Sequence, residues 1–120
     1  MQILIVDDNE LVRRGVSTLL SSRPGWQVCG HAGDGVEAVQ KAKELHPDLI
    51  LLDISMPGSN GLEVAVTLGR EIPEAKIVVM SQHDPALLLP RALEAGADAC
   101  VDKDSLSTDL LPIIESFGKS

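Results

Sequence analysis

Hydrophobic residues alternate along the chain between short unbroken runs and longer segments with helical spacing. The unbroken runs contain few polar residues, which is typical of strands buried on both faces in a parallel sheet. In the segments between them, apolar residues lie three and four positions apart, which indicates helices with one buried face. We expect strands at residues 2–6, 26–32, 48–53, 76–81 and 99–102, and helices at 10–22, 36–45, 62–70, 84–95 and 107–117.

Five strands that alternate with five helices predict an α/β fold. This order implies a parallel sheet with helices on both faces and right-handed crossovers. Five βα units are too few for a closed eight-stranded barrel, so we expect an open, doubly wound sheet. The 120 residues are enough for one domain. Pro90 and Pro112 fall inside predicted helices, and we expect Pro90 to weaken or kink its helix.

Polar residues stand at the carboxyl ends of four predicted strands. They are Asp7 and Asp8 after the first strand, Asp53 at the end of the third, Ser81 at the end of the fourth and Lys103 after the fifth. Ligands of doubly wound sheets bind beyond this edge, so we expect these side chains to converge. Two carboxylates about 4 Å apart repel by roughly 4 kcal/mol at an effective dielectric constant near 20. Without a cation, either one carboxyl group has a raised pKa or the site loosens.

The chemistry of this set suits a divalent cation and phosphoryl transfer. Oxygen ligands with room for water favour Mg²⁺ over zinc. Asp53, at the end of the predicted central strand, is the expected nucleophile, and Asp7 and Asp8 are the expected metal ligands. Ser81 and Lys103 are expected to bind the phosphoryl oxygens from the other side. An aspartate at a strand end can also be a helix N-cap, so the prediction depends on all five residues meeting.

Composition narrows the function further. Ten basic and 18 acidic residues give a formal charge of −8, which opposes direct binding of nucleic acids by this chain. No segment approaches the roughly 20 apolar residues of a membrane span, and no basic region precedes the first strand. We therefore expect a soluble, cytoplasmic protein without a membrane partner. Cys29 and Cys100 lack metal-binding spacing and are expected to be reduced thiols.

The chain resembles, over nearly its whole length, the receiver domains of two-component response regulators. The matching stretches are Ile3–Asn9, Pro47–Pro57, Asn60–Gly61, Val79–Asp84 and Ala92–Lys103. The segments Ser81–Asp84 and Ala95–Ala97 are similar to those of the NarL/FixJ (LuxR-type) subclass. Members of this subclass usually continue into a helix-turn-helix DNA-binding domain. We expect residues 1–120 to form the receiver domain and the DNA-binding domain to be missing from this chain.

The resemblance implies a flavodoxin-like fold with strand order 2-1-3-4-5 and a role for each site residue. Asp53 is implied to be the phosphoacceptor. Mg²⁺ is implied to bind Asp8 directly, Asp7 mainly through water, and also Asp53 and the backbone carbonyl of Ser55. Ser81 would donate to a phosphoryl oxygen and Lys103 would pair with the phosphate.

The resemblance also implies the partners of the protein. A sensor histidine kinase or a small phosphodonor would phosphorylate Asp53, and the resulting change of conformation would control an output, expected to be transcription. Contact with DNA would be made only by the missing domain, and a homodimer is plausible for the family. The chain is not expected to be an enzyme beyond its own phosphorylation and dephosphorylation.

Several positions depart from the family pattern. Cys100 stands where an aromatic residue is usual, so either the output signals through the loop around His83 or the conformational coupling is weak. His83 either influences hydrolysis of the phosphate or is a surface histidine, and Met56 and Pro57 are expected only to shape their loop. Asp104 follows the lysine where proline is common.

A cis peptide before a residue other than proline costs about 3 kcal/mol, so we expect the bond before Asp104 to be trans. With strand order 2-1-3-4-5, Cys29 and Cys100 lie on opposite edges of the sheet. Four strand spacings separate them by about 19 Å. A disulfide needs Cα atoms within about 7 Å, so an intramolecular bond is excluded on this fold.

Three other functions compete with this interpretation. A flavodoxin-like electron carrier needs a phosphate-binding loop after the first strand, but Asp7–Glu10 would repel a phosphate without metal. A phosphatase of the haloacid dehalogenase type has a DxD pattern there, which Asp7–Asn9 does not match. A receiver that signals without phosphate is disfavoured by the complete acidic set and favoured by Cys100.

Overall fold

The computed structural model describes residues 1–56, 60–82 and 84–117. The strands are β1 Gln2–Val6, β2 Gln27–Ala32, β3 Leu49–Asp53, β4 Lys76–Ser81 and β5 Ala99–Asp102. The helices are α1 Glu10–Ser21, α2 Gly35–Leu45, α3 Gly61–Glu71, α4 Pro85–Glu94, the short 3₁₀ helix η1 Lys103–Ser105 and α5 Leu106–Phe117. The predicted order of strands and helices is confirmed, and η1 is an addition. The predicted roles of Pro57 and His83 lie outside the described residues.

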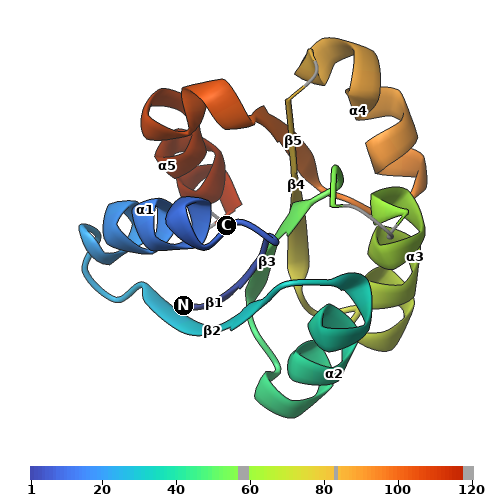
Figure 1. Ribbon diagram of the computed structural model, residues 1–120, viewed down its shortest axis with the longest axis horizontal. Helices are drawn as coiled ribbons and strands as arrows, with labels where there is room; N and C mark the ends of the chain where they lie inside the picture. The colour runs from blue at the N-terminus through green and yellow to red at the C-terminus, as the bar shows by residue number, and fades with distance from the viewer. Residues whose placement is uncertain (57–59, 83, 118–120) are drawn as a thin grey trace.

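All five strands are parallel and form one sheet in the order β2-β1-β3-β4-β5. Helices α1 and α5 cover one face, and α2, α3 and α4 cover the other (Figure 1). The predicted doubly wound fold and its strand order are therefore confirmed. β1 and β3 lie next to each other in the sheet, which places the residues that follow them side by side.

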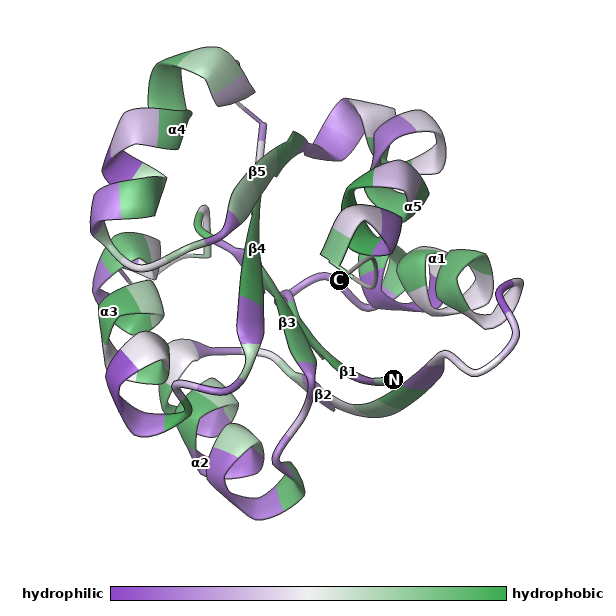
Figure 2. Ribbon diagram, turned by 180° about the vertical axis from the view of Figure 1, so that it is seen from behind, coloured by the Kyte–Doolittle hydropathy of each residue, from purple (hydrophilic) through white to green (hydrophobic). Residues whose placement is uncertain are grey.

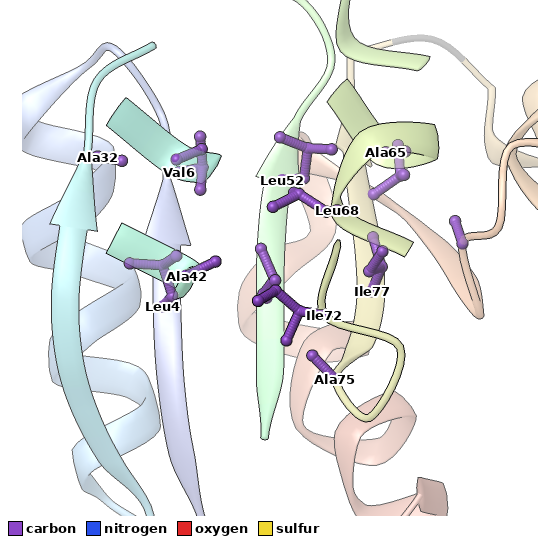
Figure 3. Close-up of a cluster of buried hydrophobic side chains, with 14 of the residues drawn as sticks. Leu4, Val6, Ala32, Ala42, Leu52, Ala65, Leu68, Ile72, Ala75 and Ile77 are labelled. Atoms are coloured by element: carbon purple, nitrogen blue, oxygen red, sulfur yellow. The ribbon is translucent and has the colours of Figure 1, made fainter. Parts of the chain in front are cut away.

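The sheet is buried on both faces, as the unbroken apolar runs predicted. Successive strand residues point to opposite faces, so Leu4 and Leu52 pack toward α2 and α3, whereas Ile5 and Leu51 pack toward α1 and α5. Figure 3 shows part of the first of these two clusters. Figure 2 shows hydrophobic residues along β3 and β4 and both kinds of residue on the helices. This packing holds the strand ends in a fixed register.

Side-chain caps begin the helices that follow the strands. Asn9 accepts hydrogen bonds from the backbone N–H groups of Leu11 and Val12 at 2.9 and 3.2 Å, and so starts α1. Asp34 and Asn60 cap α2 and α3 in the same way. These caps fix the loops at the carboxyl edge of the sheet. Pro90 lies inside α4, and the helix continues through it to Glu94.

Two smaller expectations about the backbone and the cysteines are also met. The described residues contain no cis peptide bond, so the bond before Asp104 is trans. Cys29 on β2 and Cys100 on β5 lie on opposite edges of the sheet, and both thiols are free. Of the helices in the described ranges, none has the length and hydrophobicity that a membrane crossing requires.

Candidate functional site

Three aspartates meet at the carboxyl edge of the two central strands. Val6 pairs with Leu52, so Asp7, directly after β1, lies beside Asp53 at the end of β3. One carboxylate oxygen from each of Asp7, Asp8 and Asp53 lies within 4.8 Å of the other two. Asp7 is fully buried and Asp53 is 2% exposed, whereas Asp8 is exposed. The predicted convergence of these three residues is thus present in the structure.

Lys103 reaches into this acidic cluster from η1. Its Nζ lies 2.8 Å from Asp7 Oδ2 and 3.2 Å from Asp53 Oδ2. The contact with Asp53 is a hydrogen bond. The contact with Asp7 is the shorter of the two and is an ion pair. One ammonium group therefore lies between the two buried carboxylates, a contact with Asp7 that sequence reasoning did not predict.

The other oxygen of each buried carboxylate is held by its own loop. Asp7 Oδ1 accepts a hydrogen bond from the N–H of Asn9 at 2.9 Å. Asp53 Oδ1 accepts one from the N–H of Ser55 at 2.8 Å. Because both Oδ1 atoms are bound to the backbone, both Oδ2 atoms are turned toward Lys103. The backbone thus orients the two carboxylates before any ligand arrives.

The electrostatic balance of the site raises the pKa values of Asp53 and Lys103. Burial raises the pKa of Asp53, and the charge of Asp7 adds to this increase. The Ser55 N–H and Lys103 oppose the increase without cancelling it. Burial lowers the pKa of Lys103, but its contacts with Asp7 and Asp53 raise that pKa more. The expectation that one carboxyl group of the cluster has a raised pKa is confirmed for Asp53.

Ser81 and Cys100 lie on the strands next to this cluster. Met80 pairs with Asp53, so Ser81, the last residue of β4 and fully buried, lies one position further toward the carboxyl edge. Cys100 pairs with Val79 and packs against the cluster of apolar residues beneath α3 and α4. Burial raises the pKa of the Cys100 thiol. Ser55 is exposed. The roles given to Ser81 and to the Ser55 carbonyl stay predictions.

The acidic cluster has the donor set that Mg²⁺ requires. Two oxygens on one Mg²⁺ lie at most about 4.2 Å apart, because each is about 2.1 Å from the ion. The observed limit of 4.8 Å needs only a small closure, which the exposed Asp8 side chain can make. Asp7 Oδ2 already lies 2.8 Å from Lys103 Nζ, so a ligand or a metal-bound water would share this oxygen with the ammonium group. These residues therefore fit a Mg²⁺ site.

Arg13 was not identified from the sequence. Its Nη1 donates a hydrogen bond of 2.5 Å to the backbone carbonyl of Asp7. The two residues are six positions apart, a spacing with no simple periodic meaning. The contact arises because α1 turns back over the end of β1, and sequence patterns do not specify that geometry.

Comparison with known proteins identifies the family. The family model described as "Response regulator receiver domain" matches residues 3–115 of the chain. The chain therefore belongs to this family of regulatory domains. The response regulator GacA of Pseudomonas viridiflava is 37% identical over 114 residues, which are 95% of this chain and 53% of GacA. The transcriptional regulatory protein LnrK of Bacillus subtilis (strain 168) is 39% identical over 111 residues, 92% of this chain and 50% of LnrK. The chain thus spans about half the length of these relatives.

Solved structures agree with this assignment. A two-component response regulator of the LuxR family from Aurantimonas sp. SI85-9A1 has a TM-score of 0.90 and 33% sequence identity. The match covers 97% of this chain and 83% of that one. The predicted resemblance of this chain to response-regulator receiver domains is therefore confirmed, and its structural neighbours include regulators of the LuxR and NarL subclass.

Proposed function

We propose that this receiver domain is a phosphorylation-controlled switch in which Asp53 accepts a phosphoryl group. In this proposal, Mg²⁺ is held by Asp7, Asp8, Asp53 and the backbone carbonyl of Ser55. The observation that supports it most is the environment of Asp53, which is buried, bound to Lys103 and within 4.8 Å of two further carboxylates. A carboxylate that served only as a helix cap would not need such an environment.

The chemistry follows from these positions. A carboxylate oxygen of Asp53 attacks the phosphorus of a phosphodonor, and a new P–O bond forms as an acyl phosphate. The bond from phosphorus to the donor breaks, and its electron pair leaves with the donor. The N–H of Ser55 orients the Asp53 carboxylate during the attack. Bound Mg²⁺ would supply positive charge to the carboxylates and to the incoming phosphoryl oxygens.

Lys103 and Ser81 complete this site on the side of β4 and β5. The Lys103 ammonium, already within 3.2 Å of Asp53, would neutralise one phosphoryl oxygen. The Ser81 hydroxyl would donate a hydrogen bond to another. Both groups favour the charged phosphoryl transition state, and neither takes or gives a proton in the transfer.

Labelling of Asp53 tests the proposal. Wild type incubated with acetyl phosphate and Mg²⁺ should gain one phosphoryl group by intact mass spectrometry, whereas Asp53→Asn should gain none. Asp34→Asn is a matched control, because Asp34 is an exposed helix cap at the same edge and asparagine also caps helices. Equal labelling of Asp53→Asn and wild type would rule out Asp53 as the acceptor.

We also propose a wider role for this receiver domain, as one part of a longer protein. Because the chain matches about half of its relatives, one of which is named as a transcriptional regulatory protein, we propose a helix-turn-helix DNA-binding domain beyond residue 120. A sensor histidine kinase would phosphorylate Asp53, and DNA would be bound only by the second domain. A homodimer is plausible for the family and is part of this proposal. The sequence of the gene beyond Ser120 tests the domain assignment directly.

A further inference from the structure

Arg13 extends from the first turn of α1 back toward the acidic cluster. Its Nη1 donates to the Asp7 carbonyl at 2.5 Å, in a partly buried bond. The same nitrogen lies 3.9 Å from the place where a side chain on Gly33 would begin. The guanidinium group therefore lies between the loops that follow β1 and β2, and it binds the first of them.

This bond fixes the peptide group that joins Asp7 to Asp8. The carbonyl of Asp7 and the N–H of Asp8 belong to one planar unit, so holding the carbonyl fixes the direction in which Asp8 leaves the strand. Hydrogen bonds also hold the backbone before and after this peptide group. The N–H of Asp7 donates to the carbonyl of Ala32 at 3.0 Å, and the N–H of Asn9 donates to Asp7 Oδ1 at 2.9 Å. Asp8 is itself exposed, so the backbone rather than packing sets its position.

The charge of Arg13 does not explain its position. Within the described ranges, its guanidinium forms no ion pair with a carboxylate, whereas the neighbouring Arg14 pairs with Glu10 at 2.9 Å. A positive group beside a cation site repels the cation. If Arg13 acted through charge alone, its removal would strengthen Mg²⁺ binding. If it acts through geometry, its removal weakens binding, and the sign of the change separates the two cases.

We propose that Arg13 is a positioning residue for the Mg²⁺ site, holding the Asp7–Asp8 peptide so that the Asp8 carboxylate faces the ion. This inference rests on the proposed Mg²⁺ site. Partners that orient metal ligands typically contribute 10- to 100-fold to metal affinity. We therefore expect Arg13→Met to weaken Mg²⁺ binding about 10-fold.

The test is a titration with MgCl₂ followed by amide shifts in two-dimensional NMR. Arg14→Met is the matched control, because it removes the same charge from the adjacent, exposed position on α1. Its affinity should equal or slightly exceed that of wild type. Arg13→Lys should recover part of the loss, since an ammonium also donates to a carbonyl, and it carries the test if Arg13→Met does not fold. Binding by Arg13→Met as tight as wild type, or tighter, would overturn the proposal.

Phosphorylation kinetics give an independent readout. With acetyl phosphate, Arg13→Met should need about 10-fold more Mg²⁺ for half-maximal rate and should reach the wild-type rate at saturating Mg²⁺. A lower maximal rate with unchanged Mg²⁺ dependence would contradict a positioning role. The titration also separates the two proposals. If wild type binds Mg²⁺ in an Arg13-dependent way but is not labelled on Asp53, the phosphoacceptor proposal fails and the role of Arg13 stands.

Discussion

Lys103 compensates two buried negative charges, and its replacement by methionine tests how much the fold depends on that compensation. Lys103→Met removes the ammonium and keeps most of the side-chain stem. Lys103 is 11% exposed, and its partners Asp7 and Asp53 are 0% and 2% exposed. Water therefore screens these contacts less than it screens surface ion pairs.

The distances set the size of the effect. At 2.8 and 3.2 Å, with an effective dielectric constant near 20, the two attractions are about 6 and about 5 kcal/mol. The variant also loses the desolvation cost of the ammonium, which is several kcal/mol. Breaking a buried ion pair by removing one partner typically destabilises a protein by about 3–5 kcal/mol. We expect Lys103→Met to lose about 3–5 kcal/mol of stability in the metal-free protein. For a domain of about this length, 1 kcal/mol shifts the Tm by about 4 °C, so the Tm should fall by about 12–20 °C.

Thermal unfolding in EDTA and in saturating MgCl₂ measures the effect. Mg²⁺ should restore most of the lost stability, because a bound cation takes over the compensation that the ammonium gave. Lys76→Met is the control, since Lys76 is half-exposed and lies 3.9 Å from Asp98, and it should change stability by less than about 1 kcal/mol. An unchanged Tm of Lys103→Met in EDTA would refute the compensation. An equal loss with and without Mg²⁺ would assign the effect to packing.

Two further predictions concern the loop after β3 and the titration of Asp53. A Cβ on Gly61 would lie 2.3 Å from the Ile54 Cα, whereas one on Gly69 would meet nothing within 4 Å. Gly61→Ala should therefore lower the free energy of unfolding by about 1–3 kcal/mol, and Gly69→Ala should raise it by about 0.5–1 kcal/mol; urea unfolding measures both, and equal effects would contradict the contact. The pKa of Asp53 in the folded protein is raised above the value of 3.8 for a free aspartate side chain. Ionisation of Asp53 therefore destabilises the folded state, and this effect grows as the pH rises from 3.8 through the folded-state pKa. Asp53→Asn should therefore raise the Tm of the metal-free protein at pH 7, and the gain should shrink as pH falls toward 3.8; a lower Tm at pH 7 would contradict this sign.

The sequence was sufficient for the layers of the fold and for the acidic edge of the sheet. The run Leu49–Leu52 is fully buried, as an unbroken apolar run in a parallel sheet requires. Once the sheet is parallel, Asp7 and Asp53 must lie at the same edge, because parallel strands end on the same side. Periodicity did not specify the strand order. That order was implied by the family resemblance and then confirmed by the structure.

Contacts made by long side chains were harder to predict. Lys103 was expected beside a phosphate, and its contact with Asp7 depends on η1, which Asp102 begins by accepting a hydrogen bond from the N–H of Asp104. Arg13 depends in the same way on the angle at which α1 leaves β1. Both side chains are flexible, and their direction follows from local turns that hydrophobic spacing does not encode.

Cys100 stands on β5 at a position where the family usually has an aromatic residue. The sequence located the departure from the usual aromatic residue, and the structure places Cys100 opposite Val79 with its side chain packed against the apolar cluster. A small, partly buried side chain has no bulky ring to exchange between two positions. The two alternatives that follow from Cys100, signalling through the loop around His83 or weak conformational coupling, stay predictions.

The charges at the carboxyl edge explain why a divalent cation suits the site. Three carboxylates against one ammonium leave a formal charge of −2 when all are ionised. A divalent cation neutralises that charge, whereas a monovalent cation leaves half of it. Without metal, the protein relies on Lys103 and on the raised pKa of Asp53. In the proposed reaction, conversion of Asp53 to an acyl phosphate adds negative charge beside Lys103. The Lys103 ammonium would then be drawn from Asp7 toward the phosphoryl group, so one side chain both balances the unmodified site and responds to its modification.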